Sequence, residues 1–480
     1  MDLRSFIALL EREGELVRVR PEVDPYLEMA EIADRASKAR GPALLFEQPK
    51  RGAGAAGTAV PVLMNQFGSY RRLELALGAP LDDIAQRIGG LLELQVPSGL
   101  VGKVKALGQL KELASYGPRI VKKAAFREVV VDPPDLARLP VLTTWPGDGG
   151  PFVTLPVVVT KDRQGRQNAG MYRLQVYDGQ TTGMHIHIHH DGAANFREAG
   201  DRMEVAVALG TDPAVTYAAT APLPPGISEF MFAGFLRGEP VELAQCATVD
   251  LAVPADSEIV LEGYVERGET RLEGPFGDHT GYYSLADQYP VFHLTAMSHR
   301  RDPIYPATIV GKPPMEDAYL GKATERLFLP LLQLVQPEIV DMDLPIEGVF
   351  HDCAIISIRK EYPGHARKIM NAVWGMGQMM FTKFVVVVDE HVDVHDYSEV
   401  TWRVFNNVDP ARDTVIASGP LDVLDHSSPL ARYGSKMGID ATKSWPEEGH
   451  GREWPEELVM DPEVSRRVTS RWSELGLPFV

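Results

Sequence analysis

The N-terminal part of the chain alternates between two kinds of apolar pattern. Apolar residues recur at helical spacing over 3–13, and the ELVRVR that follows alternates apolar and polar positions like a strand. Similar alternation of helix and strand patterns continues to about residue 116. The pattern therefore predicts an N-terminal α/β domain over 1–116.

Over 117–318 the pattern changes to short strand-like runs separated by turn residues. The runs are TLPVVVTK, MYRLQVYD, TTGMHIHIH, EVAVALG, SEIVLEGYVE and YPVFHLTAMS. Short runs of period two or of continuous apolar character, with no crossover helices between them, are typical of a β-rich barrel or sandwich.

Helical patterns return after residue 318. Helical spacing over 318–334, 365–374 and 398–406 brackets the strand-like runs CAIISIRK and KFVVVVDE. These runs predict a C-terminal α/β domain over 319–455, beginning with a linker helix, and a polar helical tail over 456–480. The predicted fold class is mixed, α+β.

Composition excludes several classes of function. The formal net charge of −18 creates a field that repels nucleic-acid phosphates and anionic lipid. Two cysteines, Cys246 and Cys353, support neither a disulfide framework nor a thiolate zinc site. No window of eighteen apolar residues predicts a membrane span. We therefore expect a cytoplasmic protein.

The pair Asp178-Gly179 between two strand-like runs is a hairpin signal. If these two residues form the whole loop, Asn168 lies opposite His189. Asn168 and His189 are then candidate ligands for a divalent ion. Arg173 shares the face of Asn168 only if a bulge intervenes.

The run MHIHIHH sets His185, His187 and His189 on one face of a strand and turns His190 away. One interpretation is an exposed, solvated histidine strand. Another is the start of a metal-dependent hydrolase site, although such sites normally need further ligands at the ends of parallel barrel strands.

Ser228 stands at a predicted helix N-cap, so Glu229 falls in the first helical turn. Glu229 either complements the helix dipole or acts as a third ligand. Asn168, His189 and Glu229 together would form a mixed N/O site that suits manganese or magnesium.

Lys436 in YGSKMGID follows two residues whose backbone amides could contact a phosphate. The alternative is an ordinary solvated lysine.

The segment LEGPFGDHTGYY places Glu273 and Asp278 on either side of a proline-stiffened turn. Closely spaced acids push one pKa upward, so that a proton is held near neutral pH for acid catalysis. The alternative is a polar turn at a barrel rim.

These motifs together resemble the UbiD family of reversible decarboxylases, and closest is its 3-polyprenyl-4-hydroxybenzoate branch. The resemblance covers nearly the whole chain. It is carried in order by NAGMYRLQV, MHIHIHHDGA, PLPPGISE, VPADSEIVLEGYVERGETRLEGPFGDHTGYY, DPIYPATIVGKPPMED, TKFVVVVDE, DPARDT and GSKMGIDAT.

The resemblance implies a central split β-barrel of the flavin-reductase-like kind between two α/β domains. It implies prenylated FMN as cofactor, held through manganese and potassium. Its metal ligands match Asn168, His189 and Glu229, and a phosphate contact matches Lys436. The catalytic residues of the family match Arg173, Glu273 and Asp278, where Arg173 also contacts the cofactor.

The resemblance further implies decarboxylation of an aromatic or α,β-unsaturated acid. The leading candidate substrate is a hydroxyarene acid such as 4-hydroxy-3-polyprenylbenzoate, and a polyprenylated substrate would bring peripheral contact with a membrane. Furan, pyrrole and naphthoate carboxylic acids are the alternative substrates. A flavin prenyltransferase would supply the cofactor, and the family forms homodimers or homohexamers. Rival hypotheses are the metal-dependent hydrolase and a non-catalytic flavin-binding subunit.

Overall fold

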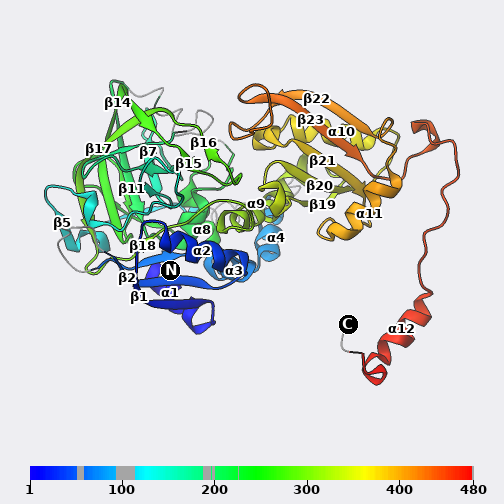
Figure 1. Ribbon diagram of the computed structural model, residues 1–480, viewed down its shortest axis with the longest axis horizontal. Helices are drawn as coiled ribbons and strands as arrows, with labels where there is room; N and C mark the ends of the chain where they lie inside the picture. Colours follow the sequence, from blue (N-terminus) through cyan, green and yellow to red (C-terminus); the bar gives the residue numbers. More distant parts are fainter. Residues whose placement is uncertain (51–58, 93–113, 187–195, 197–199, 225, 478–480) are drawn as a thin grey trace, which may run out of the picture.

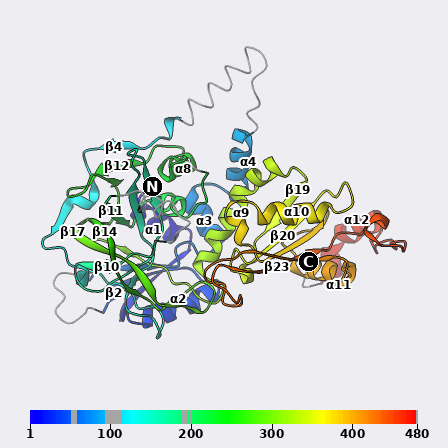
Figure 2. The ribbon, with the colours of Figure 1, turned by 90° about the horizontal axis from the view of Figure 1, so that it is seen from above.

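The computed structural model describes residues 1–50, 59–92, 114–186, 196, 200–224 and 226–477. The chain forms two lobes, and the long helix α9 (Glu316–Val335) runs between them (Figures 1 and 2). The N-terminal and middle regions build one lobe and the C-terminal domain builds the other. The predicted mixed fold class is confirmed.

The N-terminal region is a small sheet covered by helices. Asp2 caps the first helix by accepting a hydrogen bond from the Ser5 amide. Its sheet has the order β1-β2-β3-β18, so its last strand is contributed by residues near the end of the middle region. The elements are α1 (Leu3–Arg12), β1 (Leu16–Val23), α2 (Glu28–Lys38), β2 (Ala43–Pro49), β3 (Val62–Met64), α3 (Tyr70–Leu77), α4 (Leu81–Leu92) and β18 (Tyr305–Pro306).

The middle region is predominantly antiparallel, as its short runs predict. Its main sheet has the order β10-β17-β14-β11-β7-β8, and β5 pairs with β17. The strands of this sheet are β5 (Val129–Val131), β7 (Val157–Lys161), β8 (Gln167–Gly170), β10 (Thr181–Gly183), β11 (Arg202–Leu209), β14 (Ile259–Glu273) and β17 (Asp287–His299).

Smaller elements surround this sheet. They are β4 (Arg119–Val121), η1 (Ala125–Glu128), η2 (Leu136–Arg138), β6 (Phe152–Val153), β9 (Leu174–Gln175), α7 (Pro213–Ala218), α8 (Glu229–Arg237), β12 (Glu242–Gln245), β13 (Ala252–Pro254), β15 (Phe276–Gly277) and β16 (Tyr283–Ser284).

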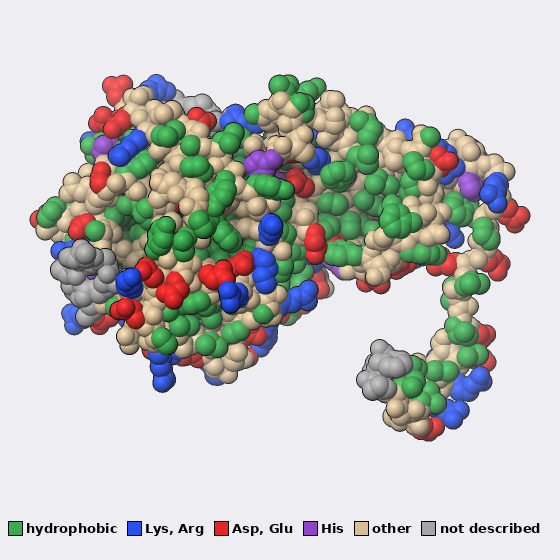
Figure 3. Space-filling view, viewed as in Figure 1, with side chains coloured by type: hydrophobic (Ala, Val, Ile, Leu, Met, Phe, Trp, Pro, Cys, Tyr) green, Lys and Arg blue, Asp and Glu red, His purple; other side chains and the backbone are tan. Residues whose placement is uncertain are grey.

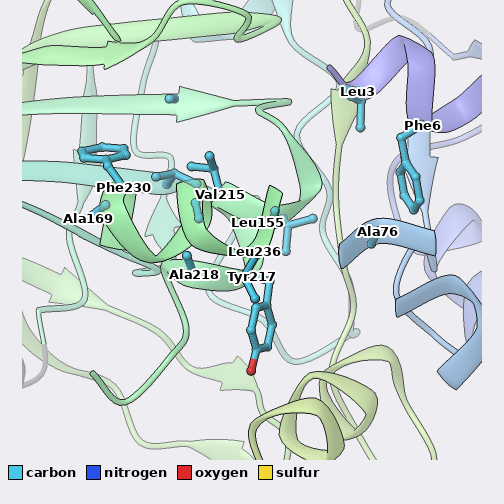
Figure 4. Packing of buried hydrophobic residues seen from close by; sticks show 14 of the residues in the cluster. Leu3, Phe6, Ala76, Leu155, Ala169, Val215, Tyr217, Ala218, Phe230 and Leu236 are labelled. Carbon is cyan, nitrogen blue, oxygen red and sulfur yellow. The ribbon is translucent and has the colours of Figure 1, made fainter. Parts of the chain in front are cut away.

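One hydrophobic core joins the N-terminal region to the middle region. It includes Leu3 and Phe6 of α1, Ala76 of α3, and Tyr217 and Phe230 of the middle-region helices (Figure 4). All five are at most 1 % exposed. Because apolar burial stabilises both regions at once, they form one packed lobe.

The C-terminal domain has a central five-stranded sheet in the order β19-β20-β21-β23-β22. Its middle strands are apolar on both faces because helices cover them. The elements are β19 (Ile339–Asp343), η3 (Ile346–Gly348), β20 (Cys353–Ile358), α10 (His365–Trp374), η4 (Gly377–Phe381), β21 (Phe384–Asp389), α11 (Tyr397–Asn407), β22 (Thr414–Pro420), β23 (Tyr433–Asp440) and η5 (Pro446–Glu448).

Beyond Glu457, which pairs with Arg403 of α11, the chain leaves the body as an extended arm (Figures 1 and 3). The arm ends in α12 (Pro462–Ser470) and η6 (Trp472–Leu475), and α12 buries none of its residues. Leu458, Val459 and Met460 on the arm are 65 % exposed or more. In the described ranges, no helix is both long and apolar enough to cross a bilayer.

One predicted feature of the middle region is wrong. The Tyr177 amide donates to the Thr181 carbonyl, so the turn contains three residues and not two. Asn168 pairs with Thr160 on β7 at one edge of β8, and its predicted partner His189 lies outside the described residues. The strand predicted through the histidine run ends, within the described residues, at Gly183.

Candidate active site

Arg173, Glu273 and Asp278 meet in the middle region. Arg173 donates from Nε to Glu273 Oε1 at 3.0 Å and from Nη1 to Asp278 Oδ2 at 2.5 Å. Its third contact is to Ser284 Oγ at 3.2 Å. Glu273 is 1 % exposed and Asp278 6 %, so both carboxylates are withdrawn from solvent. One guanidinium therefore bridges the two buried acids.

The turn between the acids is held by backbone contacts. Gly274 has φ +92°, a conformation that favours glycine, and its amide donates to Gln175 Oε1 at 2.7 Å. The Gly277 amide donates to Asp148 Oδ1 at 2.8 Å, and a Cβ on Gly277 would overlap Trp145. These contacts fix the separation of the two carboxylates, as the Gly-Pro-Phe-Gly sequence predicts.

The protonation of the site differs from the expectation. Burial alone would raise the pKa of Asp278, but the hydrogen bond and charge of His279, with the charge of Arg173, hold that pKa well below its usual range. Burial would lower the pKa of His279, but Asp278 outweighs it and raises that pKa to about 9. The proton therefore resides on His279, because the Asp278 carboxylate beside it stabilises the imidazolium.

Two further residues complete this cluster, which we call the acid–arginine cluster (Arg173, His185, Glu273, Asp278 and His279). His185 Nδ1 lies 3.0 Å from Glu273 Oε1, and His279 Nδ1 lies 2.9 Å from Asp278 Oδ1. In the sequence, His185 stands out only as part of a histidine-rich strand, and His279 has no predicted role. For His279, its position directly after Asp278 was a usable signal.

The two described members of the predicted metal site lie together. Glu229 is buried at the first position of α8, where its carboxylate accepts from Asn168 Nδ2 at 2.9 Å and from the Ala169 amide at 3.0 Å. Within the described residues, Asn168 Oδ1 is buried and has no hydrogen-bond partner. A buried unsatisfied amide oxygen beside a carboxylate suits a hard cation. His189 and His190 lie outside the described residues.

The described hydrogen bonds of Lys436 do not connect it to the acid–arginine cluster. It lies on β23, and its buried ammonium donates to the carbonyl oxygens of Met380 and Thr382. Burial lowers the pKa of Lys436 to about 8. Its phosphate contact stays a prediction.

A second titratable group, which the sequence did not indicate, lies in the C-terminal domain. Ligand atoms of Glu325, Asp343 and His395 lie within 4.8 Å of one another, as in a metal site. However, Lys322 donates to Glu325 Oε2 at 2.6 Å and also to Asp343 Oδ1. Within the described residues the group is therefore a charge-balanced network around an ammonium.

Comparison with known proteins covers nearly the whole chain. The models for the N-terminal, Rift-related and C-terminal domains of 3-octaprenyl-4-hydroxybenzoate carboxy-lyase match residues 7–92, 119–313 and 318–441. An uncharacterised protein of Archaeoglobus fulgidus is 55 % identical over 99 % of this chain and 98 % of its own.

Solved structures agree with the family models. The UbiD-class enzyme HmfF from Pelotomaculum thermopropionicum in complex with FMN is 32 % identical, with TM-score 0.81 over 97 % of this chain and 98 % of its own. The chain belongs to the UbiD family. A second UbiD relative by fold, the closed form of vanillic acid decarboxylase from Sedimentibacter hydroxybenzoicus, is 29 % identical, with TM-score 0.83 over 99 % and 98 %.

Membership of the UbiD family makes this chain a carboxy-lyase. The hydrolase hypothesis has no support in the described geometry, because His185 hydrogen bonds Glu273. The three predicted catalytic side chains are present and joined, which argues against a non-catalytic subunit.

Proposed function

We propose that this UbiD-family carboxy-lyase uses prenylated FMN to decarboxylate a hydroxyarene carboxylic acid, with 4-hydroxy-3-polyprenylbenzoate or a related quinone precursor as the leading substrate. The observation that carries the proposal is the buried guanidinium of Arg173 shared by Glu273 and Asp278. When bound, the prenylated flavin would supply the electron sink that an sp² carbon lacks when it loses CO₂.

The protein's own residues bind and orient the substrate and protonate the carbon that CO₂ leaves. Arg173 holds the substrate carboxylate by a charge-assisted hydrogen bond. Glu273 orients Arg173. The second carboxylate oxygen of Glu273, Oε2, is buried and has no hydrogen-bond partner among the described residues. Asp278 returns a proton to the carbon that CO₂ leaves, so each turnover consumes one proton.

Two observations support this substrate class. Vanillic acid, the substrate named for one structural relative, is itself a hydroxybenzoic acid. Tyr282 and Leu285, which follow Asp278, are 68 % and 87 % exposed and offer apolar surface to a polyprenyl chain. Assays of CO₂ release from prenylated hydroxybenzoate, vanillate, naphthoate, furoate and pyrrole carboxylate test the proposal. Furan and pyrrole acids are the alternative, and a preference for them would overturn it.

We propose that Asn168, His189 and Glu229 bind Mn²⁺, with K⁺ nearby, and so retain the cofactor phosphate. Glu229→Ala should lose flavin absorbance after gel filtration, because Asn168 and His189 alone lack the anionic ligand that a divalent cation needs. Glu239→Ala is the control, since Glu239 is exposed at the other end of α8. Equal retention of flavin by both variants would count against the metal site.

We propose that the arm binds a second copy of this chain. Its exposed Leu458, Val459 and Met460 are unpartnered apolar surface in the described protein. An evolved form of HmfF, 31 % identical, has been solved as a dimer with prFMN. Truncation after residue 455 should lower the mass measured by light scattering by at least half. An unchanged mass would refute this role.

A further inference from the structure

A chain of hydrogen-bonding groups runs from Asp278 into the C-terminal domain. Asp278 Oδ1 lies 2.9 Å from His279 Nδ1, and His279 Nε2 lies 2.8 Å from His351 Nε2. His351 Nδ1 is buried and makes no hydrogen bond within the described residues, and it lies 3.3 Å from Oδ1 of Asp352, whose side chain is 31 % exposed. Two imidazole nitrogens at 2.8 Å require one proton between them, because one must donate and the other accept.

We propose that His351 resupplies, through His279, the proton that Asp278 gives up in each turnover. This inference rests on the proposed function, because only a decarboxylation consumes the proton. Asp278 itself is too buried for free exchange with solvent. His351 acts through other residues and is a relay residue, not a catalytic one.

The proton transfers balance as follows. His279 Nδ1–H passes its proton to Asp278, which gives it to the substrate carbon as the C–CO₂ bond breaks. The rings of His279 and His351 then turn over, so that His279 presents its remaining N–H to Asp278 and its bare nitrogen to the N–H of His351. His351 protonates that nitrogen as its own outer nitrogen takes a proton from solvent through the Asp352 carboxylate. The net change per turnover is one proton taken from solvent.

Charges around His279 favour its doubly protonated form, which we call loaded. Asp278 lies beside it, Asp317 faces it from α9, and Asp422 faces it from the β22–β23 connection. Arg173 acts in the opposite sense, but its contacts are to the far oxygen of Asp278. With its pKa raised to about 9, His279 is loaded at neutral pH and empties as the pH rises through that value.

The position of His351 is set by an unusual backbone conformation just before it. Val349 and Phe350 have φ of +45° and +54°, which non-glycine residues adopt only when their surroundings enforce it. Phe350 stacks on His279 with ring centroids 5.1 Å apart. It also packs against Gly321 of α9, where an added Cβ would lie 2.5 Å from Phe350 Cβ. The packing of α9 thus sets the position of His351.

The experiment compares His351→Gln with His426→Gln in the flavin-loaded enzyme. His426 also contacts the middle region, through Thr280 at 3.3 Å and the Tyr282 ring, but is not in the relay. In His351→Gln we expect one CO₂ per site at the wild-type rate, then a steady-state kcat lowered about 10- to 100-fold. Added imidazole should restore turnover, and the alkaline limb of the pH profile near 9 should change. His426→Gln should match wild type.

Two results would overturn the relay: a wild-type kcat and pH profile in His351→Gln, or equal losses in both variants. A separate readout needs no activity. In ¹⁵N NMR of the cofactor-free protein, a scalar coupling should be seen between the nitrogens of His279 and His351 that share a proton at 2.8 Å, and His351→Gln but not His426→Gln should abolish it. Absence of that coupling contradicts the relay, whereas absence of CO₂ release by wild type contradicts only the proposed function.

Discussion

Glu273→Gln is expected to lower kcat by on the order of 10³-fold while flavin stays bound. The substitution keeps the shape of the side chain but removes the charge that Arg173 Nε and His185 Nδ1 share at 3.0 Å each. Arg173 then loses one of its two anionic partners and no longer has a fixed orientation toward the substrate carboxylate. CO₂ release measures the loss, and flavin absorbance after gel filtration measures retention.

Glu269→Gln is the matched control for this experiment. Glu269 lies on the same strand, β14, and also pairs with a histidine, His293 at 2.7 Å, but it is 41 % exposed. It should retain wild-type activity. Full activity in Glu273→Gln would refute the assignment of Glu273, and loss of flavin in that variant would make Glu273 a cofactor-binding residue instead.

Lys322→Met is expected to destabilise the C-terminal domain by about 3–5 kcal/mol, because it removes the cation from a buried ion-paired group. Lys322 is 3 % exposed, and its partners Glu325 and Asp343 are 0 % and 1 % exposed. Methionine fills a similar volume but leaves both carboxylates without the ammonium that compensates them. Thermal unfolding followed by circular dichroism should show the corresponding fall in Tm.

Lys50→Met is the control for Lys322→Met. Lys50 pairs with Asp24 at the surface with 58 % of its side chain exposed, and such pairs contribute little. Its Tm should be unchanged. If both variants unfold at the wild-type temperature, the network around Lys322 does not stabilise the junction of α9 with β19.

Local patterns predicted the long elements well. The helix predicted over 365–374 is α10, and that over 398–406 differs from α11 by one residue at each end. These segments are strongly periodic, so burial of one face decides their structure. The hairpin at Asp178 was predicted with a loop one residue too short, because an Asp-Gly pair signals a turn but not its length.

The site was only partly accessible from sequence. The spacing of Glu273 and Asp278 around their turn predicts an acid pair, but only the family resemblance adds Arg173 to it. The contact between His279 and His351 depends on how two domains pack, which no local pattern encodes. Lys322 and Glu325 have the spacing of a solvated helical pair, yet both are buried, because β19 covers that face of α9.

The last strand of the N-terminal sheet, β18, is made by residues near the end of the middle region, after nearly all of that region has been synthesised. During synthesis β3 must therefore wait for its parallel neighbour, and at about 5–20 residues per second that delay is on the order of ten seconds to a minute. Through this interval one sheet edge stays open to wrong pairing. Until Tyr305 emerges, Val62–Met64 lack the parallel neighbour that covers this edge in the folded protein, and slower elongation lengthens that exposure.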